Sequence, residues 1–214
     1  MQKKRLIFNL DGTLLTGEAQ LTEKFFEKIY GVKAYPFVAD LSQNLDRYEK
    51  IFNRYSYDEL AQFLSMRSEL PISPRFLKEW SDAISQGKDT MDEELVDTLE
   101  HLKKKGLSLA VLTNWFGECQ LTRLERSGIL SYFDDVYTGD VVLKPHREAY
   151  MLARGNFSCE ECVFVGNSLE RDYIAPRAFG MEGILYDKDD ITHHTVAKVK
   201  KIGELKENRR IYGE

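Results

Sequence analysis

The chain lacks long hydrophobic runs, a disulfide-forming set of cysteines and a strong excess of either charge. Its 214 residues include three cysteines, an odd number that argues against a disulfide framework and suits a reducing compartment. No apolar stretch approaches the length that spans a bilayer. Lys and Arg total 30 against 35 Asp and Glu, so the net charge of -5 provides no general attraction to nucleic acid or anionic membranes. We therefore expect no nucleic-acid partner and no membrane partner, and the oligomeric state stays open.

The amino terminus starts with basic residues, as secretory signal peptides do, but its apolar segment is very short. Leu6, Ile7 and Phe8 are followed at once by Asn9 and Asp11. A signal peptide needs a longer apolar run and a cleavage site of small residues. We therefore predict a first buried strand over residues 5–10 and a cytoplasmic protein.

Residues 21–86 have the apolar spacing of helices, with no β run among them. Apolar side chains recur at intervals of three and four, as in Phe25, Phe26 and Ile29. Prolines at 36, 71 and 74 divide the stretch into several helices. Most of its aromatic residues are expected to form a local core, and one or two are candidates to line a pocket. The stretch predicts a separate all-helical unit inserted after the first strand.

From Gly87 onward the pattern alternates between helix and strand. Helices are predicted over 91–105, 117–127, 145–154 and 169–179, and strands over 107–113, 136–137, 162–165 and 183–186. The spacing of Val196, Val199 and Ile202 predicts a last helix that docks on the core. Repeated βα units indicate an α/β fold with a parallel, Rossmann-like sheet and helices on both faces. We expect an α/β domain from residues 1–13 and 87–214, and a small all-helical domain over 14–86.

Polar residues follow the predicted parallel strands at the points where the strands end. They are Asn9 to Thr13 after the first strand, Thr113 and Asn114 after the second, Lys144 after the third, and Asn167, Ser168 and Asp172 after the fourth. The carboxyl ends of parallel strands meet at one edge of a sheet, where ligands bind in such folds. The sequence therefore predicts one site at this edge.

The order of these residues resembles the four motifs of the haloacid dehalogenase superfamily. Those motifs read Asp-x-Asp-Gly-Thr, then apolar-Thr-Asn, then Lys-Pro, then Gly-Asp/Asn with a later Asp. The resemblance covers residues 5–13 and roughly 87–190, and the helical insert lies where many members carry a cap domain. It implies a magnesium-dependent phosphohydrolase that acts on an ester or anhydride of a small phosphorylated metabolite.

The departure from the family pattern is Asn9, which stands where the family has its nucleophilic aspartate. That carboxylate attacks phosphorus and forms an aspartyl-phosphate. An amide is a poor nucleophile, and each ~1.4 kcal/mol of barrier lowers the rate tenfold, so we expect a loss of several orders of magnitude. Two interpretations stay open. Either Asp was replaced to trap a ligand, which we favour because the other positions stay phosphatase-like, or the chain is a naturally impaired member that binds a phosphate ligand or regulates.

Asp11 is the second acidic position of the first motif. In extended backbone the side chains of residues 9 and 11 point the same way, so we expect both in one cavity. The resemblance gives Asp11 the role of proton donor to the leaving oxygen. Family members with Asp here are typically phosphatases, and this disfavours a third alternative, the hydrolysis of haloacids.

Other residues of the motifs are expected to bind the phosphoryl group. The hydroxyl of Thr113 and the N–H groups of the following turn are candidate donors to its oxygens. Lys144 would contribute a positive charge beside it. Gly12, Thr13 and Asn114 complete the expected substrate-binding set.

The resemblance also implies a magnesium site. The expected ligands are residue 9, the Asp11 carbonyl, Asn167 and Asp172, which offer the hard oxygen atoms that Mg²⁺ prefers. Many relatives have Asp where this chain has Asn167, so two of the usual negative charges are missing and we expect weaker binding. Ser168 and Glu170 are candidates to support the ligands from behind.

Cys159 and Cys162 have the C-x-x-C spacing of redox and zinc sites. Such a site needs a second ligand pair or an activating helix terminus. Cys162 instead begins an apolar strand, and His193 and His194 lie far along the chain. These features disfavour a metal or redox role for the pair.

Overall fold

The chain folds around a six-stranded sheet, and the computed structural model describes residues 3–31, 35–68, 71–192 and 195–213. The strands are β1 (Arg5–Phe8), β2 (Ser108–Leu112), β3 (Asp135–Tyr137), β4 (Cys162–Gly166), β5 (Glu182–Tyr186) and β6 (Lys198–Val199). All neighbouring strands are parallel, in the order β3-β2-β1-β4-β5-β6. The α/β fold class with a parallel sheet is confirmed.

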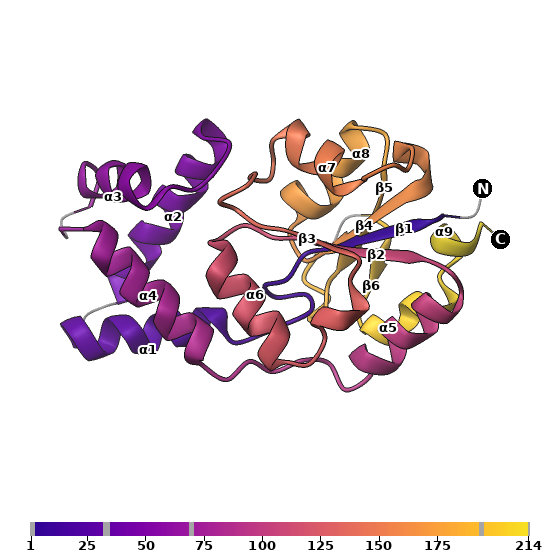
Figure 1. Ribbon diagram of the computed structural model, residues 1–214, viewed down its shortest axis with the longest axis horizontal. Coiled ribbons are helices and arrows are strands. Elements are labelled where there is room, and N and C mark those ends of the chain that lie inside the picture. Colours follow the sequence, from indigo (N-terminus) through magenta and orange to yellow (C-terminus); the bar gives the residue numbers. More distant parts are fainter. Residues whose placement is uncertain (1–2, 32–34, 69–70, 193–194, 214) are drawn as a thin grey trace.

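Helices cover both faces of this sheet (Figure 1). The helices of the sheet region are α5 (Leu95–Lys104), α6 (Gly117–Arg126), α7 (Arg147–Ala153), α8 (Ala175–Ala178) and α9 (Arg209–Tyr212), with a π-helix η4 (Leu169–Ile174) and 3-10 segments η2 (Leu130–Tyr132), η3 (Cys159–Glu161) and η5 (Ile202–Glu207). Leu6 and Phe8 of β1 belong to the hydrophobic cluster that includes α5, while Ile7 belongs to the cluster that includes α7. Successive strand residues face opposite sides, which explains why one strand is buried from both.

Strand β1 occupies the centre of the sheet, hydrogen-bonded to β2 on one side and β4 on the other. The chain leaves β1 toward one half of the sheet and later returns to the other half, so a crevice opens beyond its carboxyl end. Asn9 and Asp11 follow β1 directly. The topology therefore puts the first motif at the point where a parallel sheet binds ligands.

Four helices between β1 and α5 pack together beside the carboxyl edge of the sheet (Figure 1). They are α1 (Glu18–Tyr30), α2 (Tyr35–Ile51), α3 (Tyr57–Ser65) and α4 (Pro74–Gln86). Aromatic rings fill their shared cluster: Phe26 meets Trp80 edge-on with centroids 5.3 Å apart. Trp80 also lies 4.8 Å from Trp115 of the sheet region, so the two parts share apolar contacts.

Two connections link these helices to the sheet region, and they run side by side. Thr16 and Thr90 form an isolated antiparallel bridge, with backbone N–H···O distances of 2.8 and 2.7 Å. Their hydroxyl groups are also 2.7 Å apart. The two connections are therefore joined at one place.

The prediction of a last helix around Val199 and Ile202 is wrong. Val199 instead belongs to β6, which pairs with β5 at the edge of the sheet, and Ile202 begins a 3-10 segment. Both side chains are buried, so the prediction that this segment docks on the core was right. Spacings of three also suit a 3-10 turn, which eclipses residues i and i+3. His193 and His194 lie outside the described residues.

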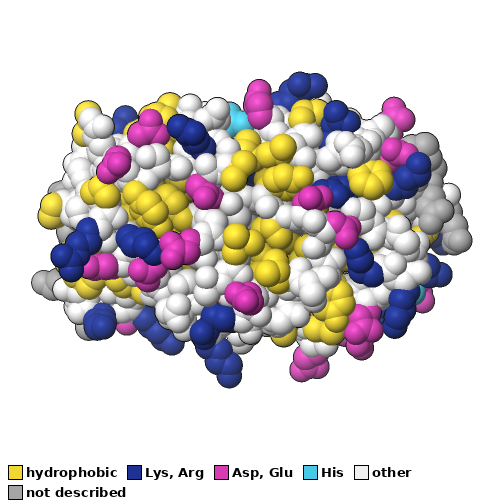
Figure 2. Space-filling view, in the orientation of Figure 1, with side chains coloured by type: hydrophobic (Ala, Val, Ile, Leu, Met, Phe, Trp, Pro, Cys, Tyr) yellow, Lys and Arg dark blue, Asp and Glu magenta, His cyan; other side chains and the backbone are white. Residues whose placement is uncertain are grey.

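The face drawn in Figure 2 shows charged side chains of both signs interspersed among its described residues. Hydrophobic side chains appear there in small groups between them. Among the described residues, the structure contains no helix with the length and apolar character needed to cross a membrane.

Candidate active site

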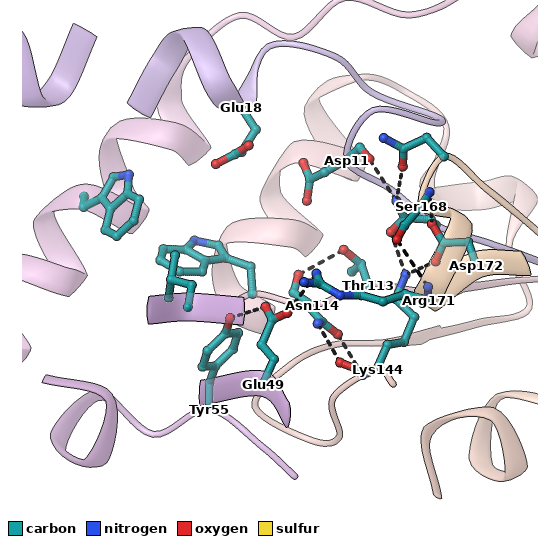
Figure 3. A pocket seen from close by; sticks show the side chains of 15 residues that line it. Asp11, Glu18, Glu49, Tyr55, Thr113, Asn114, Lys144, Ser168, Arg171 and Asp172 are labelled. Atoms are coloured by element: carbon teal, nitrogen blue, oxygen red, sulfur yellow. Dashed lines mark hydrogen bonds and ion pairs between the residues drawn. The ribbon is translucent and has the colours of Figure 1, made fainter. Parts of the chain in front are cut away.

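A cavity of about 270 Å³ opens at the carboxyl ends of the strands (Figure 3). From the sheet side it is lined by Asn9, Asp11, Thr113, Asn114, Lys144, Asn167, Ser168, Arg171 and Asp172. From the inserted helices and the turn after α2, its lining includes Glu18, Leu45, Glu49, Tyr55 and Trp80. Segments that are far apart in the sequence thus meet around one space, as the strand ends predicted.

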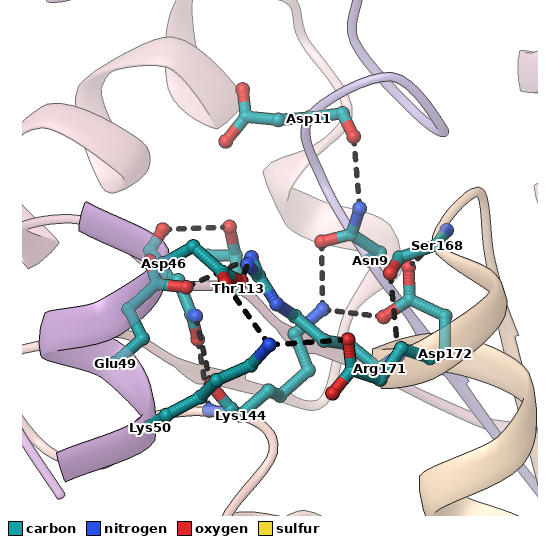
Figure 4. Close-up of polar contacts among 12 residues, drawn as sticks. Asn9, Asp11, Asp46, Glu49, Lys50, Thr113, Lys144, Ser168, Arg171 and Asp172 are labelled. Atoms are coloured by element: carbon teal, nitrogen blue, oxygen red, sulfur yellow. Dashed lines mark hydrogen bonds and ion pairs between the residues drawn. The ribbon is translucent and has the colours of Figure 1, made fainter. Parts of the chain in front are cut away.

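Asn9 is buried, and its side-chain amide both donates and accepts hydrogen bonds (Figure 4). The Nδ2 group donates to the carbonyl oxygen of Asp11 at 2.8 Å and to Oδ1 of Asn167 at 2.9 Å. Its Oδ1 accepts from Nζ of Lys144 at 2.9 Å. The amide therefore touches three of the residues predicted to share the site.

Lys144 lies between residue 9 and Asp172 with only 3% of its side chain exposed. Its Nζ donates to Oδ1 of Asp172 at 2.7 Å, and the other carboxylate oxygen accepts from the backbone N–H of Ser168 at 3.0 Å. Asp172 is fully buried. The predicted cation and the predicted acidic ligand thus form a buried ion pair.

Asp11 lines the cavity, but its carboxyl group points away from Asn9 (Figure 4). The expectation that side chains 9 and 11 point the same way is wrong, because strand β1 ends at Phe8 and the alternation of side chains stops with it. The Asp11 carboxylate instead accepts from Nη1 of Arg123 at 2.6 Å and from Nε2 of Gln120 at 2.7 Å. It is therefore held from behind by helix α6.

Thr113 and Asn114 both line the cavity, and both make internal hydrogen bonds. The Thr113 hydroxyl donates to the Asn114 carbonyl at 3.0 Å and accepts from Gln120 at 2.9 Å. The Asn114 side chain bonds the backbone N–H and carbonyl of Lys144, at 2.9 and 3.1 Å. Asn114 therefore holds the backbone that carries the lysine.

Gly12 and Thr13 stand beside the main cavity and outside its lining. Gly12 has φ +73°, and a Cβ there would lie 2.3 Å from Nδ2 of Asn167, so the position needs glycine on both counts. The Thr13 hydroxyl donates to Oδ1 of Asn167 at 3.2 Å. In this structure Thr13 supports Asn167 and Gly12 leaves room for its side chain, and the predicted contact of both residues with substrate stays a prediction.

Acidic side chains of the inserted helices line one side of the cavity. Glu49 of α2 is buried; its carboxylate is 2.8 Å from Nη1 of Arg171 and accepts a hydrogen bond from the Tyr55 hydroxyl. Burial raises the pKa of Glu49, and the charge of Arg171 opposes that rise. Arg171 also pairs with Asp46 at 2.5 Å, so α2 is tied to the π-helix η4.

Glu18, at the start of α1, differs from the other cavity carboxylates because it has no ion-pair partner among the described residues. It accepts one hydrogen bond, from the Thr22 hydroxyl at 3.1 Å. Burial, and then the nearby charge of Asp11, raise the pKa of Glu18 to about 7. Trp115, whose φ is 88°, adds a buried indole N–H that has no hydrogen-bond partner within the described part of the chain.

The predicted magnesium ligands come together, but as they stand they suit a doubly charged cation poorly. Within the described residues no group of three or more His, Cys, Asp and Glu side chains is placed to hold a metal ion. Asp172 is the sole carboxylate side chain in the predicted set, and both its oxygens are already bonded. The N–H groups of Asn9 also face the other two predicted oxygens. Glu170 turns to Lys50 of α2 and does not support the ligands.

The haloacid dehalogenase-like hydrolase family matches residues 6–186, which include β1, the inserted helices and the strands through β5. The chain belongs to this family.

Two curated relatives of this haloacid dehalogenase-like chain are phosphatases of small molecules. A ribulose-1,5-bisphosphate 5-phosphatase of Halopiger xanaduensis is 32% identical over 64% of this chain and 59% of its own length. A glyceraldehyde 3-phosphate phosphatase of Methanocaldococcus jannaschii is 30% identical over 53% of this chain and 55% of its own length. The chain thus spans little more than half the length of each of these relatives.

Solved structures of the haloacid dehalogenase type share the fold over nearly the whole chain. A HAD phosphatase from Thermococcus onnurineus has a TM-score of 0.68 at 24% identity, covering 97% of both chains. The L-2-haloacid dehalogenase from Xanthobacter autotrophicus has a TM-score of 0.74 at 19% identity, covering 96% of this chain and 97% of its own. At such identities the likeness shows the fold.

The cysteines of this haloacid dehalogenase-like chain stay outside the site. Cys162 is buried in β4, and burial raises the pKa of its thiol to about 11, so it is protonated at neutral pH. Cys159 is half-buried and lies 4.0 Å from the sulfur of Met151. Within the part of the chain that the structure describes, no cationic side chain is bonded to either thiol.

Sequence reasoning missed the residues that come from outside the four motifs. They are Glu18, Glu49, Tyr55, Trp115, Gln120, Arg123 and Arg171. Gln120 and Arg123 lie three apart on α6 and so share one helix face. That spacing was a usable signal for these two, whereas contacts from the inserted helices depend on how they pack.

Proposed function

We propose that this chain has the site of a magnesium-dependent phosphohydrolase for small phosphorylated metabolites, and that Asn9 impairs turnover. The observation that supports this most directly is the meeting of Asn9, Asp11, Lys144 and Asp172 around one cavity of about 270 Å³. A buried cation beside residue 9 suits a phosphoryl group, since it offsets charge where water is excluded. The phosphatase relatives act on small phosphorylated molecules, which agrees with a cavity of this size.

With Asp at position 9, the reaction would proceed in two steps. The carboxylate attacks phosphorus, the bond to the bridging oxygen breaks, and that oxygen takes its electron pair and a proton from Asp11. Water then gives a proton to Asp11 and attacks the aspartyl-phosphate, which releases phosphate and restores the carboxylate. Lys144 lies where its charge would stabilise the phosphoryl oxygens.

Magnesium would be held by residue 9, the Asp11 carbonyl, Asn167 and Asp172, and would supply positive charge to the transferring group. Asp at position 9 would give this set a second carboxylate and remove the N–H groups that now face its oxygens. The same change would restore the nucleophile.

The helices α1–α4 would act as a cap over the cavity. Glu18, Glu49 and Trp80 line it from that side, and the Thr16–Thr90 bridge joins the two connections at residues 14–17 and 87–90. A cap in this place would exclude water from the reaction and restrict the leaving group to small molecules.

A phosphate-release screen with Mg²⁺ tests this proposal, with sugar phosphates, nucleotides and pyrophosphate as substrates. It compares the Asn9→Asp chain with the unmodified chain, called the parent below. We expect Asn9→Asp to exceed the parent by at least about 10³-fold on its best substrate, because the amide cannot attack phosphorus. An Asn9→Ala chain is the matched control and should stay as inactive as the parent. Equal activity of parent and Asn9→Asp would refute the role given to position 9.

A second candidate function is the binding of a phosphate ligand without turnover. It is favoured by the hydrogen bonds of Asn9, which satisfy the oxygens of Asp11 and Asn167 within the chain itself. Calorimetric titration of the parent with inorganic phosphate distinguishes the two roles when Asn9→Asp stays inactive. Binding by the parent with no gain of hydrolysis in Asn9→Asp would favour the binding role.

A further inference from the structure

We propose that Arg123 is a positioning residue for Asp11, and that it ties this acid to the segment through which the inserted helices rejoin the sheet region. The proposal rests on the proposed phosphohydrolase function and names a residue outside the four motifs. The geometry that carries it is a buried contact of one guanidinium with two carboxylates from different segments.

Arg123 projects from α6 and is 1% exposed. Its Nη1 donates to Oδ1 of Asp11 at 2.6 Å, while Nε and Nη2 donate to the two carboxylate oxygens of Asp89 at 2.9 and 2.8 Å. An arginine side chain stays charged and has a rigid, planar fork of donors, which suits the holding of two carboxylates in one orientation.

The contact fixes Asp11 in a direction that the proposed reaction needs. In an in-line displacement the leaving oxygen lies on the far side of phosphorus from the nucleophile. An acid that faces the cavity but points away from residue 9 can reach that far side. Gln120 holds the second Asp11 oxygen at 2.7 Å and is itself bonded to Nη1 of Arg123 at 2.8 Å, so both oxygens have set positions.

Asp89 holds the other edge of the Arg123 guanidinium. The bidentate pair makes two of the three carboxylate contacts of Arg123, and Asp11 makes the third. Asp89 precedes Thr90, the residue that bridges to Thr16. A Cβ on Gly17 would lie 3.1 Å from Oδ1 of Asp89, so both connections pack around this carboxylate. The orientation of Asp11 is therefore linked to the place where the inserted helices attach.

The leaving group provides a test that separates positioning from plain structural support. In the Asn9→Asp chain, kcat/KM is measured for 2,4-dinitrophenyl phosphate, whose leaving group departs without a proton, and for the alkyl phosphate that the chain cleaves fastest. This parameter reports the first step and excludes the later hydrolysis, in which Asp11 accepts a proton from water. General acid catalysis contributes about 10²–10⁴-fold, so we expect Arg123→Met to lower kcat/KM for the alkyl phosphate by about 10–100-fold. For the dinitrophenyl ester we expect a fall of less than about threefold, because no proton donor is required.

Arg126→Met is the matched control, since Arg126 lies on the same helix but is exposed and makes one long contact, to the Gln86 carbonyl at 3.4 Å. It should change neither rate. An equal fall for both substrates in Arg123→Met, or no fall for either, would overturn the proposal. Absence of all hydrolysis in Asn9→Asp itself would be a failure of the proposed function instead.

Two further variants decide the matter if Arg123→Met does not fold. Arg123→Lys keeps the charge but cannot hold both carboxylates with a fork, so we expect the same preferential loss with the alkyl phosphate. Asp89→Asn keeps Arg123 and Asp11 and tests the link to the connecting segment. A preferential loss there supports the link, and unchanged kcat/KM for both substrates rejects it.

Discussion

The side-chain nitrogen of Asn9 lies 2.8 Å from the carbonyl oxygen of Asp11, and with its second hydrogen it reaches Oδ1 of Asn167 at 2.9 Å. Both oxygens belong to the predicted metal site. An amide at position 9 therefore gives them hydrogen bonds from within the chain. A carboxylate at the same position has no hydrogen to donate. Its oxygens, the Asp11 carbonyl and Oδ1 of Asn167 would then face one another, which favours the binding of a cation between them.

Magnesium binding should follow from this relationship. We expect Asn9→Asp to bind Mg²⁺ at least about tenfold more tightly than the parent, a difference of about 1.4 kcal/mol, because one charge is added and two competing N–H groups are lost. Isothermal titration calorimetry with MgCl₂ measures this directly. Asn9→Ala removes the N–H groups without adding a charge and should gain much less. Equal affinities of parent and Asn9→Asp would contradict the assigned site.

The buried pair of Lys144 and Asp172 should make the two residues strongly interdependent in stability. Removing the cation alone with Lys144→Met leaves a fully buried carboxylate without its ion partner, and we expect a cost of about 3–5 kcal/mol in urea unfolding. Adding Asp172→Asn should recover part of that loss, since the uncompensated charge disappears. The double-mutant cycle is performed in the parent chain, so it does not depend on activity. Additive costs would show that the two side chains do not interact.

Glu18 should make the stability of the metal-free chain fall with rising pH. Its pKa is raised from 4.5 to about 7, so the folded state favours the protonated form. That contribution is fully present below about pH 4.5 and is lost as the pH rises through about 7. Glu18→Gln should therefore be more stable than the parent at pH 8 by about 1–2 kcal/mol, allowing for the partial exposure of the group, and equal to it near pH 4.

Thermal unfolding of both chains between pH 4 and pH 8 measures the Glu18 effect. Glu23→Gln is the matched control, because Glu23 is an exposed glutamate of the same helix. It should not reproduce the pH-dependent difference. A Glu18→Gln profile parallel to that of the parent would show that the carboxyl group titrates normally.

The sequence predicted the sheet and the strand-end residues because both depend on local patterns. Short apolar runs such as the one ending at Leu112 identify buried strands, and their parallel arrangement brings Thr113 and Lys144 to one edge. The roles given to these residues stay predictions. The hydrogen bonds of residue 9 were harder to predict, because an amide and a carboxylate have the same shape but differ at one atom, where the amide NH₂ donates and the carboxylate oxygen accepts.

The contacts of Asp11 could not be predicted from the sequence. Its partner Arg123 lies 112 positions further along the chain, and Asp89 lies 34 positions before Arg123. Nothing in the local pattern of a charged helix distinguishes a buried arginine from a solvated one. Glu49 meets Arg171 only because α2 packs against η4, which is a property of the packed structure.

The bridge between Thr16 and Thr90 limits how the inserted helices could swing. A tether made of one strand of chain allows twisting in any direction, whereas two chain segments bonded to each other resist torsion. If the inserted helices act as the proposed cap, we expect them to rotate about an axis through this bridge, so opening and closing would retrace one path. Each such movement would strain the backbone at Thr90, one residue away from Asp89.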